Sequence, residues 1–274
     1  MINCGGNRIQ EGIDCNDFSA FLAVRGDNRW QRVIGVRIKR QYADEASARS
    51  GRGNGGGSGM KGAIFDMDGT LLDSMQVWVH VGEQYLRNRG IEPEEGLGDV
   101  LFPMSMRDGA VYVKERYGLP DSPDTIVTDM DAIVFAAYRD EVLPKPGVAA
   151  YLESLKKQGI PMAVATATNR PMVEAALART GLAGYFKQIF TCTEIGAGKE
   201  RPDIYLAAAK ALGTHPADTW VFEDALYAIK TAKAAGFYTV GLYDETSRND
   251  QEAIAGLADC YVREIQSVPT QDCT

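Results

Sequence analysis

From Met60 onward, the sequence alternates short apolar segments with longer segments whose apolar residues recur every three or four positions. The short segments predict strands and the longer ones predict helices. This alternation is typical of a mostly parallel sheet with helices on both faces, which binds ligands beyond the carboxyl ends of its strands. We therefore predict an α/β fold with a Rossmann-like parallel sheet, whose strands lie at 62–65, 161–166, 188–191, 219–222, 238–243 and 259–262. The helices expected between them are 146–159, 171–181, 202–213 and 225–236.

One segment interrupts the alternation. Residues 75–143 contain no convincing strand and instead predict three helices, at 76–90, 105–118 and 122–142. An insertion of roughly 70 residues is too long for a loop in a compact domain, so it predicts a helical cap. The predicted domains are an α/β core made of 60–74 and 144–274, and a helical cap made of 75–143.

The first 59 residues differ in composition from the rest of the chain. They hold 9 Lys and Arg against 6 Asp and Glu, whereas the remainder holds 20 against 31. They end in the glycine-rich stretch 50–59, which is typical of a flexible linker. Two strands are expected, at 20–26 and 30–42, but two strands alone are marginally stable. We expect residues 1–59 to be a poorly ordered extension that takes no part in the chemistry.

The composition of the whole chain argues against two kinds of binding partner, nucleic acids and membranes. A net charge of −8 and a pI of about 5.0 argue against nucleic-acid binding. No apolar run reaches the roughly 18–20 residues that a membrane span needs, and no secretory signal is visible. The five cysteines are odd in number and form no CxxC, which favours a reduced, cytoplasmic protein. We expect a cytoplasmic monomer that binds a small molecule.

Acidic side chains follow two of the predicted strands. Asp66 and Asp68 follow the first strand in FDMDGTLLDS, and Glu223 and Asp224 follow the fourth in VFEDA. Carboxylates gathered at one sheet edge repel each other unless a cation lies among them. Mg²⁺ binds through a few carboxylates together with a substrate phosphate. We therefore predict that Asp66 and Asp224 hold Mg²⁺.

Two further side chains would reach the same sheet edge. Thr166 ends the second strand within ATATNR, and Lys199 lies in GKERPD before the third helix. A hydroxyl and an ammonium group suit the oxygens of a phosphoryl group that is being transferred. Gly69 permits a turn that brings Asp68 back to the side of Asp66. One carboxylate could then attack phosphorus while the other handles the proton of the leaving group.

These four segments, in this order, resemble the four motifs of the haloacid dehalogenase superfamily. The insertion resembles the type 1 cap of that superfamily, and the beta-phosphoglucomutase-like branch is the most similar. The resemblance covers residues 60–274. It implies that Asp66 is the nucleophile, forming an aspartyl-phosphate, and that Asp68 is the general acid and then the general base. It also implies that Thr166 and Lys199 hold the phosphoryl group.

The same resemblance implies further ligands. Asp66, the backbone carbonyl of Asp68, and Asp224 would bind Mg²⁺, with Glu223 close by. Members that cleave phosphonates or carbon–halogen bonds lack the second acid, so its presence favours phosphate esters. The substrate would face two residues that follow the second strand, Asn169 and Arg170.

The cap departs from the mutase pattern. Mutase members carry a histidine ten residues after the second acid, where this chain has Trp78, and a cap lysine, where it has Pro103. Arg107 matches the arginine of that pattern. Hydrolysis is therefore favoured over mutase chemistry. Trp78 could pack in the cap or contact substrate, Arg107 could reach a distal anionic group, and Met104 could pack in a helix or line an apolar wall over the leaving group.

Simpler structural roles stay open for single residues. Thr166 alone would suit a buried strand, Lys199 alone would suit a surface, and Glu223 and Asp224 could cap the next helix. Taken together, the residues predict a Mg²⁺-dependent phosphoric monoester hydrolase acting on a small phosphorylated metabolite, with a sugar phosphate as the default. The alternatives are a phosphomutase of the same fold, and a non-catalytic protein that binds a phospho-ligand or a protein partner.

Overall fold

The computed structural model of the chain describes residues 59–269. These residues belong to one compact unit, Asn54–Thr274. The two strands expected at 20–26 and 30–42 lie outside the described residues, as does nearly all of the glycine-rich linker. The sheet, the helical insertion and every predicted site residue lie within the described range.

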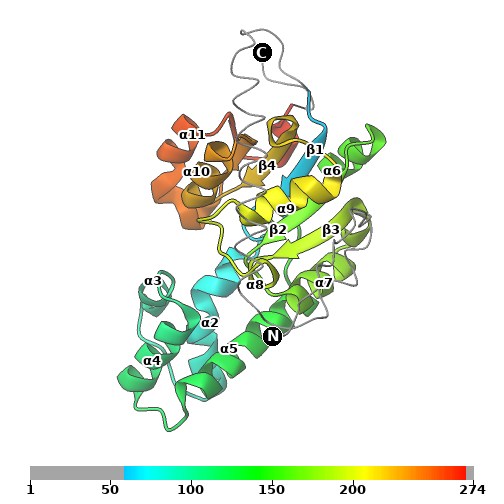
Figure 1. Cartoon of the computed structure of the whole chain (residues 1–274). Coiled ribbons are helices and arrows are strands. Elements are labelled where there is room, and N and C mark those ends of the chain that lie inside the picture. Colours follow the sequence, from blue (N-terminus) through cyan, green and yellow to red (C-terminus); the bar gives the residue numbers. More distant parts are fainter. Residues whose placement is uncertain (1–58, 270–274) are drawn as a thin grey trace, which may run out of the picture. The chain divides into compact units, whose positions relative to one another are not determined.

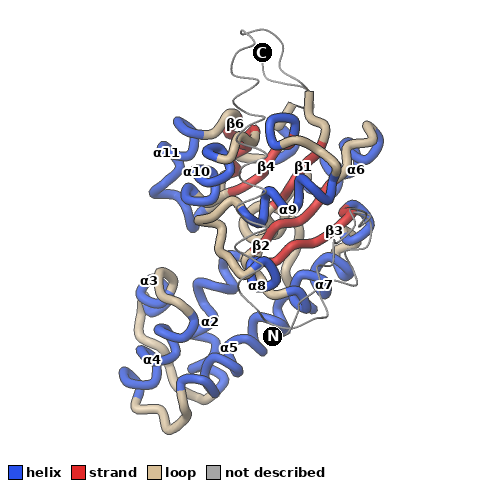
Figure 2. Tube along the Cα trace, in the orientation of Figure 1, coloured by secondary structure: helices blue, strands red, loops and turns tan. Residues whose placement is uncertain are grey.

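Six parallel strands form one sheet in the order β3-β2-β1-β4-β5-β6 (Figures 1 and 2). Central strand β1 pairs with β2 on one side and with β4 on the other. All residues of these three strands are buried, as expected for parallel strands covered on both faces. The fold class predicted from the sequence is confirmed, and each strand lies within two residues of its expected position: β1 (Gly62–Phe65), β2 (Met162–Thr166), β3 (Phe186–Thr191), β4 (Thr219–Glu223), β5 (Tyr238–Leu242) and β6 (Cys260–Val262).

Helices pack directly on this sheet. α9 (Asp203–Leu212) contacts β1, β2 and β3, and α10 (Leu226–Ala234) contacts β4 and β5. From α6 (Val148–Lys157), the ring of Tyr151 meets Phe222 with centroids 5.8 Å apart, and Phe222 stacks on Phe65 at 4.3 Å. The remaining helices of this part are α7 (Arg170–Arg179), α8 (Cys192–Ile195), α11 (Gln251–Leu257) and the 3₁₀ turns η1 (Ala183–Tyr185), η2 (Pro216–Asp218), η3 (Glu245–Asp250) and η4 (Ile265–Ser267).

Residues 75–143, which we call the cap segment, are helical and contain no strand. Their helices are α2 (Met75–Asn88), α3 (Leu97–Leu101), α4 (Met106–Tyr117) and α5 (Pro123–Asp140). Serine hydroxyls cap two of them: Ser105 accepts from the N–H of Asp108, and Ser122 accepts from the N–H of Thr125, both at 3.1 Å. The short helix α3 was not predicted. That the segment forms a separate domain stays a prediction. Within residues 59–269, no helix is both long enough and apolar enough to cross a membrane.

The chain leaves and rejoins the sheet region at one place. The N–H of Asp73 donates to the carbonyl of Leu143, and the N–H of Lys145 donates to the carbonyl of Leu71, both at 2.9 Å. On the return path, α5 packs against α7, and the side chain of Arg179 in α7 donates to the carbonyl of Val142. The end of α5 is therefore held against α7, and Figure 1 shows α5 running beside α7.

Candidate active site

The loop after β1 turns sharply. Gly69 has a φ of 75°, in the left-handed region that favours glycine. A Cβ atom at Gly69 would collide with the carboxylate of Asp224, so the position is restricted by space as well as by backbone conformation. Lys145 holds the turn from outside, because its Nζ donates to the carbonyl of Gly69 at 2.7 Å and lies 3.0 Å from Oδ2 of Asp244. The turn lets Asp66 and Asp68 lie at the same sheet edge.

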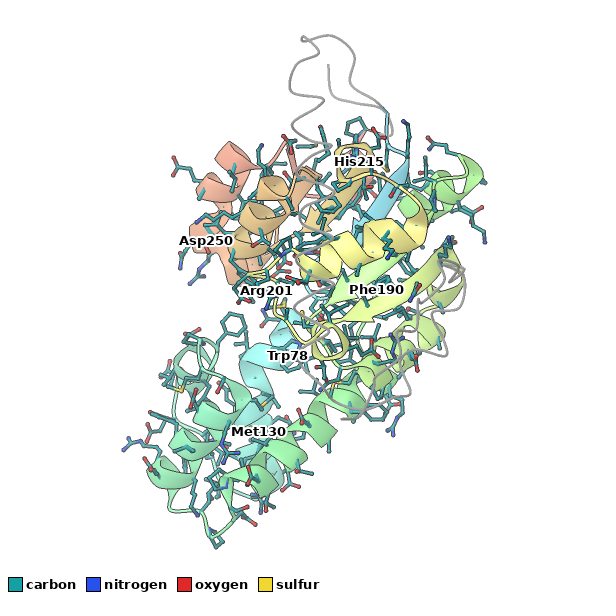
Figure 3. All side chains as sticks on the ribbon, viewed as in Figure 1. Trp78, Met130, Phe190, Arg201, His215 and Asp250 are labelled. Atoms are coloured by element: carbon teal, nitrogen blue, oxygen red, sulfur yellow. The ribbon has the colours of Figure 1, made fainter. Side chains whose placement is uncertain are left out.

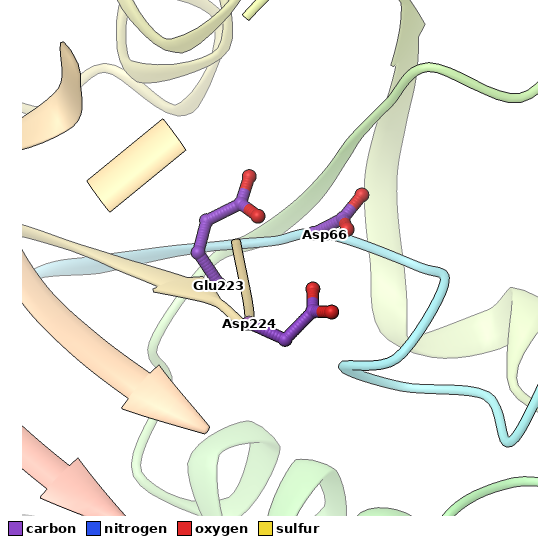
Figure 4. A group of neighbouring side chains, drawn as sticks. All are labelled: Asp66, Glu223 and Asp224. Atoms are coloured by element: carbon purple, nitrogen blue, oxygen red, sulfur yellow. The ribbon is translucent and has the colours of Figure 1, made fainter. Parts of the chain in front are cut away.

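Three buried carboxyl groups meet at this edge (Figure 4). Asp66 follows β1, while Glu223 ends β4 and Asp224 follows it. Each offers one oxygen, and these oxygens lie within 4.8 Å of one another. We call Asp66, Glu223 and Asp224 the acid cluster. Neighbouring parallel strands thus deliver residues from distant parts of the sequence to one small volume.

A single lysine lies inside the acid cluster. Nζ of Lys199 is 2.5 Å from Oδ1 of Asp66 and 2.7 Å from Oε1 of Glu223, and its side chain is only 3% exposed. The hydroxyl of Tyr205, from α9, donates to the same Glu223 oxygen at 2.7 Å. Lys199 is therefore a buried cation paired with two carboxylates.

The charges of the acid cluster do not balance. Burial opposes the charge of Lys199, but the carboxylates of Asp66 and Glu223 outweigh it and hold the pKa of this lysine above its usual range. Burial, together with the negative charge of Glu223, raises the pKa of Asp66 well above its usual value and that of Asp224 to about 7. The cluster thus holds three buried carboxyl groups, of which two pair with the ammonium of Lys199, and this leaves an excess of negative charge.

A hard divalent cation fits this excess. Oε2 of Glu223 is buried and has no hydrogen-bond partner among the residues that the structure describes. An unpartnered buried carboxylate oxygen is costly, and a bound cation would satisfy it. The cluster offers only oxygen ligands, which Mg²⁺ prefers. Asp66, Asp224 and Glu223 therefore make a donor set that suits Mg²⁺.

Asp68 stands apart from the acid cluster. Its Oδ1 accepts from the hydroxyls of Ser74, at 2.6 Å, and Tyr138, and its Oδ2 accepts from the hydroxyl of Thr168 at 2.6 Å. Three hydroxyl donors hold both oxygens of one carboxyl group. In turn, burial and the nearby charge of Asp68 raise the pKa of Tyr138 well above its usual value. The two acids of the first motif thus have different surroundings, one beside a lysine and one among hydroxyls.

Thr166 lies at the end of β2, at the same sheet edge. Register pairs Phe65 of β1 with Val164 of β2, so Thr166 lies one residue beyond the level of Asp66. The hydroxyl of Thr166 is fully buried and accepts from the N–H of Thr168 at 3.0 Å. This bond shapes the loop that presents Thr168 to Asp68.

The two residues expected to face the substrate after β2 are engaged elsewhere. Arg170 pairs with Glu194 of α8, with Nη2 at 2.6 Å from Oε2, and it also donates to the carbonyl of Ile189 at 2.9 Å. Oδ1 of Asn169 accepts from the hydroxyl of Thr193 at 3.0 Å. Both side chains thus join the start of α7 to β3 and α8, and their role in substrate binding stays a prediction.

Of the three cap residues predicted to bind substrate, one is linked to Asp68 and two are not. Trp78 donates through Nε1 to the hydroxyl of Tyr138 at 2.8 Å, so it reaches Asp68 through one intermediary (Figure 3 labels Trp78). Arg107 is exposed and pairs with Asp124 of α5. Met104 is half-buried at the turn before α4. Within residues 59–269, neither Arg107 nor Met104 forms a hydrogen bond or ion pair with the acid cluster.

A pocket of about 320 Å³ lies between the cap segment and η3. None of the acid cluster lines it. Its walls combine an aromatic ring with hydrogen-bonding side chains: Gln76, Val79, His80, Asp99, Phe102, Glu245, Thr246, Arg248 and Asn249. Met104, which could line an apolar wall over the leaving group, does not line this pocket.

Four residues that contribute to the site were not expected from the sequence. Tyr138 and Tyr205 lie in amphipathic helices, where the apolar periodicity predicts that an aromatic side chain packs in the core. Lys145 lies in a loop far from the motifs. Thr168 could have been found, since it is the second hydroxyl of ATATNR, two residues after the first.

The sequence is similar to those of proteins named as phosphatases. The chain is 29% identical over 185 residues to hexitol phosphatase A of Escherichia coli (strain K12), which covers 66% of this chain and 82% of that protein. It is 30% identical over 174 residues to the bifunctional riboflavin kinase/FMN phosphatase of Arabidopsis thaliana, covering 63% of this chain. The chain spans only 46% of the length of the Arabidopsis protein.

The fold has solved counterparts. A provisionally named beta-phosphoglucomutase from Thermotoga maritima superposes with a TM-score of 0.68 at 27% identity, covering 74% of this chain and 94% of that one. The sequence model of the haloacid dehalogenase-like hydrolase family matches residues 60–236, well over half of the chain. The resemblance seen in the four motifs is thereby confirmed. The protein belongs to the haloacid dehalogenase-like hydrolase family.

Proposed function

We propose that the protein is a Mg²⁺-dependent phosphatase that hydrolyses a small phosphorylated metabolite through an aspartyl-phosphate. The observation that carries this proposal is that two carboxyl groups of one loop have different charged and hydrogen-bonding neighbours. Asp66 lies beside Lys199 within the acid cluster, while Asp68 is held by hydroxyls a short distance along the chain. Two carboxyls in two environments suit two roles, nucleophile and proton carrier.

In the first step, a carboxylate oxygen of Asp66 attacks phosphorus and the ester P–O bond breaks. The proton of the Asp68 carboxyl moves to the departing oxygen, which leaves as an alcohol. Lys199 offsets negative charge on the nucleophile and on the phosphoryl oxygens. Asp66, Asp224 and Glu223 would hold Mg²⁺, which would supply further positive charge to offset that of the phosphoryl group.

In the second step, Asp68 accepts a proton from water as the water oxygen attacks phosphorus. The bond between phosphorus and the Asp66 oxygen breaks, so inorganic phosphate leaves and the Asp66 carboxylate is restored. Thr166 and the backbone N–H groups of its loop would donate to the phosphoryl oxygens in both steps. Every atom of the substrate ester and of one water molecule is thereby accounted for.

We further propose a phosphorylated sugar or polyol as the substrate class. The similarity to a hexitol phosphatase supports it. The pocket between the cap segment and η3 supports it too, because Gln76, Thr246 and Asn249 can each hydrogen-bond a hydroxyl group. Gln76 lies in α2, the helix that begins directly after Ser74, whose hydroxyl donates to Asp68.

The test is phosphate release from a panel of sugar, polyol and nucleotide phosphates and one aryl phosphate, with Mg²⁺ and with EDTA. Asp66→Asn should lower kcat by at least about 10⁴-fold, as expected for loss of a nucleophile. Asp73→Asn is the matched control, since Asp73 is an exposed acid of the same loop. Equal activity of Asp66→Asn and Asp73→Asn would refute the proposal.

A phosphomutase is the second candidate, favoured by the similarity to the Thermotoga maritima structure. It predicts that a sugar phosphate is converted to an isomer, with a bisphosphate as primer and little free phosphate. Following the substrate by ³¹P NMR distinguishes the two products directly. A cytoplasmic location, a monomeric state and the absence of nucleic-acid binding stay predictions from the sequence.

A further inference from the structure

A chain of hydrogen bonds links the cap segment to Asp68. Nε1 of Trp78 in α2 lies 2.8 Å from the hydroxyl oxygen of Tyr138 in α5, and that hydroxyl donates to Oδ1 of Asp68. We propose that Tyr138 is a positioning residue for the proton carrier Asp68, and that Trp78 fixes the direction in which Tyr138 donates. This inference rests on the proposed function and adds two residues to it.

The direction of these hydrogen bonds follows from the chemistry of the donor and acceptor groups. An indole N–H can only donate a hydrogen bond, so the oxygen of Tyr138 must accept from Trp78. The one proton of the phenol is then free to point at Asp68. Consecutive donors polarise one another, so the bond from Tyr138 to Asp68 is stronger with Trp78 in place than without it.

Tyr138 is held in place from both ends. Its side chain is fully buried, and its ring packs edge-on against the indole of Trp78, with centroids 6.3 Å apart at 74°. Its backbone carbonyl lies 3.4 Å from Nε of Arg179 in α7. A side chain fixed by ring packing and by its backbone can present its hydroxyl in one place only, which is what orienting another group requires.

The three donors to Asp68 come from three segments. Ser74 lies just before α2, Thr168 follows β2, and Tyr138 lies two residues before the end of α5. Ser74 and Thr168 would hold the carboxyl even without the cap helices beyond Ser74. Tyr138 is the contribution of the returning helix, so it ties the orientation of Asp68 to the placement of α5.

Positioning of a general acid has a measurable signature. An alkyl phosphate needs a proton on its departing oxygen, whereas an aryl phosphate such as p-nitrophenyl phosphate leaves readily without one. Because kcat/KM covers steps only up to the first irreversible one, it reports transfer to Asp66 and not the later hydrolysis. Tyr138→Phe should lower kcat/KM for the alkyl ester about tenfold, part of the 10²–10⁴-fold that general acid catalysis supplies. For the aryl ester the loss should stay below about twofold.

Tyr85→Phe is the matched control. Tyr85 is a buried tyrosine of the cap segment whose hydroxyl, within the described residues, is bonded neither to Asp68 nor to Trp78. It should leave the ratio of the two kcat/KM values unchanged. If Tyr138→Phe behaves like Tyr85→Phe, or loses both esters equally, the positioning role is overturned and Tyr138 is only part of the packing.

Trp78→Phe tests whether Trp78 orients the hydrogen bond from Tyr138 to Asp68. It should shift the ratio in the same sense as Tyr138→Phe, by about threefold, because the phenol loses the partner that orients it. In the double variant, Trp78→Phe should add nothing, since its effect passes through the Tyr138 hydroxyl. Additive losses in the double variant would overturn the role of Trp78.

The outcomes separate this inference from the proposed function. If the wild type releases no phosphate from either ester with Mg²⁺, or if Asp66→Asn is as active as the wild type, the proposed function fails and this inference falls with it. If the wild type is active, Asp66→Asn is not, and Tyr138→Phe leaves the ester ratio unchanged, only the present inference fails.

Discussion

The acid cluster and the cap segment contribute to the site in different ways. The cluster is buried, lies at the ends of central strands and pairs its charges across the sheet, as with Lys199 between Asp66 and Glu223. The cap residues expected to read the substrate are exposed or half-buried, and Arg107 pairs with its own neighbour Asp124. Under the proposed function, the chemistry would be built on buried strand ends, and the choice of substrate would be left to more exposed side chains of the cap segment.

This contrast predicts the largest effect at Lys199. Lys199→Met should lower the free energy of unfolding by about 3–5 kcal/mol, because it leaves buried carboxylates without their cation. It should also abolish measurable turnover. Urea denaturation with and without Mg²⁺ measures the first effect, and phosphate release measures the second.

Lys157→Met is the matched control for that experiment. Lys157 is an exposed lysine whose Nζ lies 3.7 Å from Glu153, and its loss should cost less than about 0.5 kcal/mol. Equal stability losses for the two lysine variants would show that burial of the ion pair at Lys199 does not matter.

The next effect concerns the cation. Mg²⁺ at a hundred times its Kd should stabilise the folded protein by about 2.7 kcal/mol, because it binds the folded state alone. Differential scanning calorimetry against EDTA would measure the shift. Asp224→Asn should remove most of it, whereas a full shift in that variant would place the cation elsewhere.

A pH-dependent effect follows from the raised pKa of Asp224, about 7 against an ordinary value of 3.8. The folded state then binds more protons than the unfolded state between these values, so the free energy of unfolding falls as pH rises. Without metal, this contribution amounts to at most about 1.4 kcal/mol per pH unit between pH 4 and pH 7, and it levels off above. Denaturation in EDTA should show this slope, and Asp224→Asn should reduce it. An unchanged slope in the variant would assign it to other groups.

The smallest effect is expected at Arg107. Arg107→Gln breaks only an exposed pair, so the free energy of unfolding should change by less than about 0.5 kcal/mol. If Arg107 also meets a distal anionic group, KM for a substrate with such a group should rise while kcat stays unchanged. A fall in kcat on the aryl ester would contradict the division between the two regions.

The contrast between the acid cluster and the cap segment also explains which parts of the fold and site could be predicted from the sequence. Strand positions and the four motifs were predictable because buried parallel strands leave continuous apolar runs, and because Asp66 and Asp224 follow such runs directly. Tyr138 was not predictable, since its partner Asp68 lies 70 residues away and a tyrosine in an amphipathic helix looks like core. The engagement of Arg170 by Glu194 depends on side-chain geometry that no local pattern encodes.

The two connections of the cap segment have a consequence for how such chains diversify. Because the chain departs at Leu71–Asp73 and returns at Leu143–Lys145 along one shared pair of backbone hydrogen bonds, the two ends of the insertion are neighbours. A segment with adjacent ends can be lengthened, exchanged or replaced by a short linker while the strand order of the sheet stays the same. The architecture thus permits grafting: a single junction, clamped by Lys145 against the carbonyl of Gly69, could accept caps of different shape over one unchanged acid cluster, and each new cap would have to supply its own donor to Asp68 in place of Tyr138.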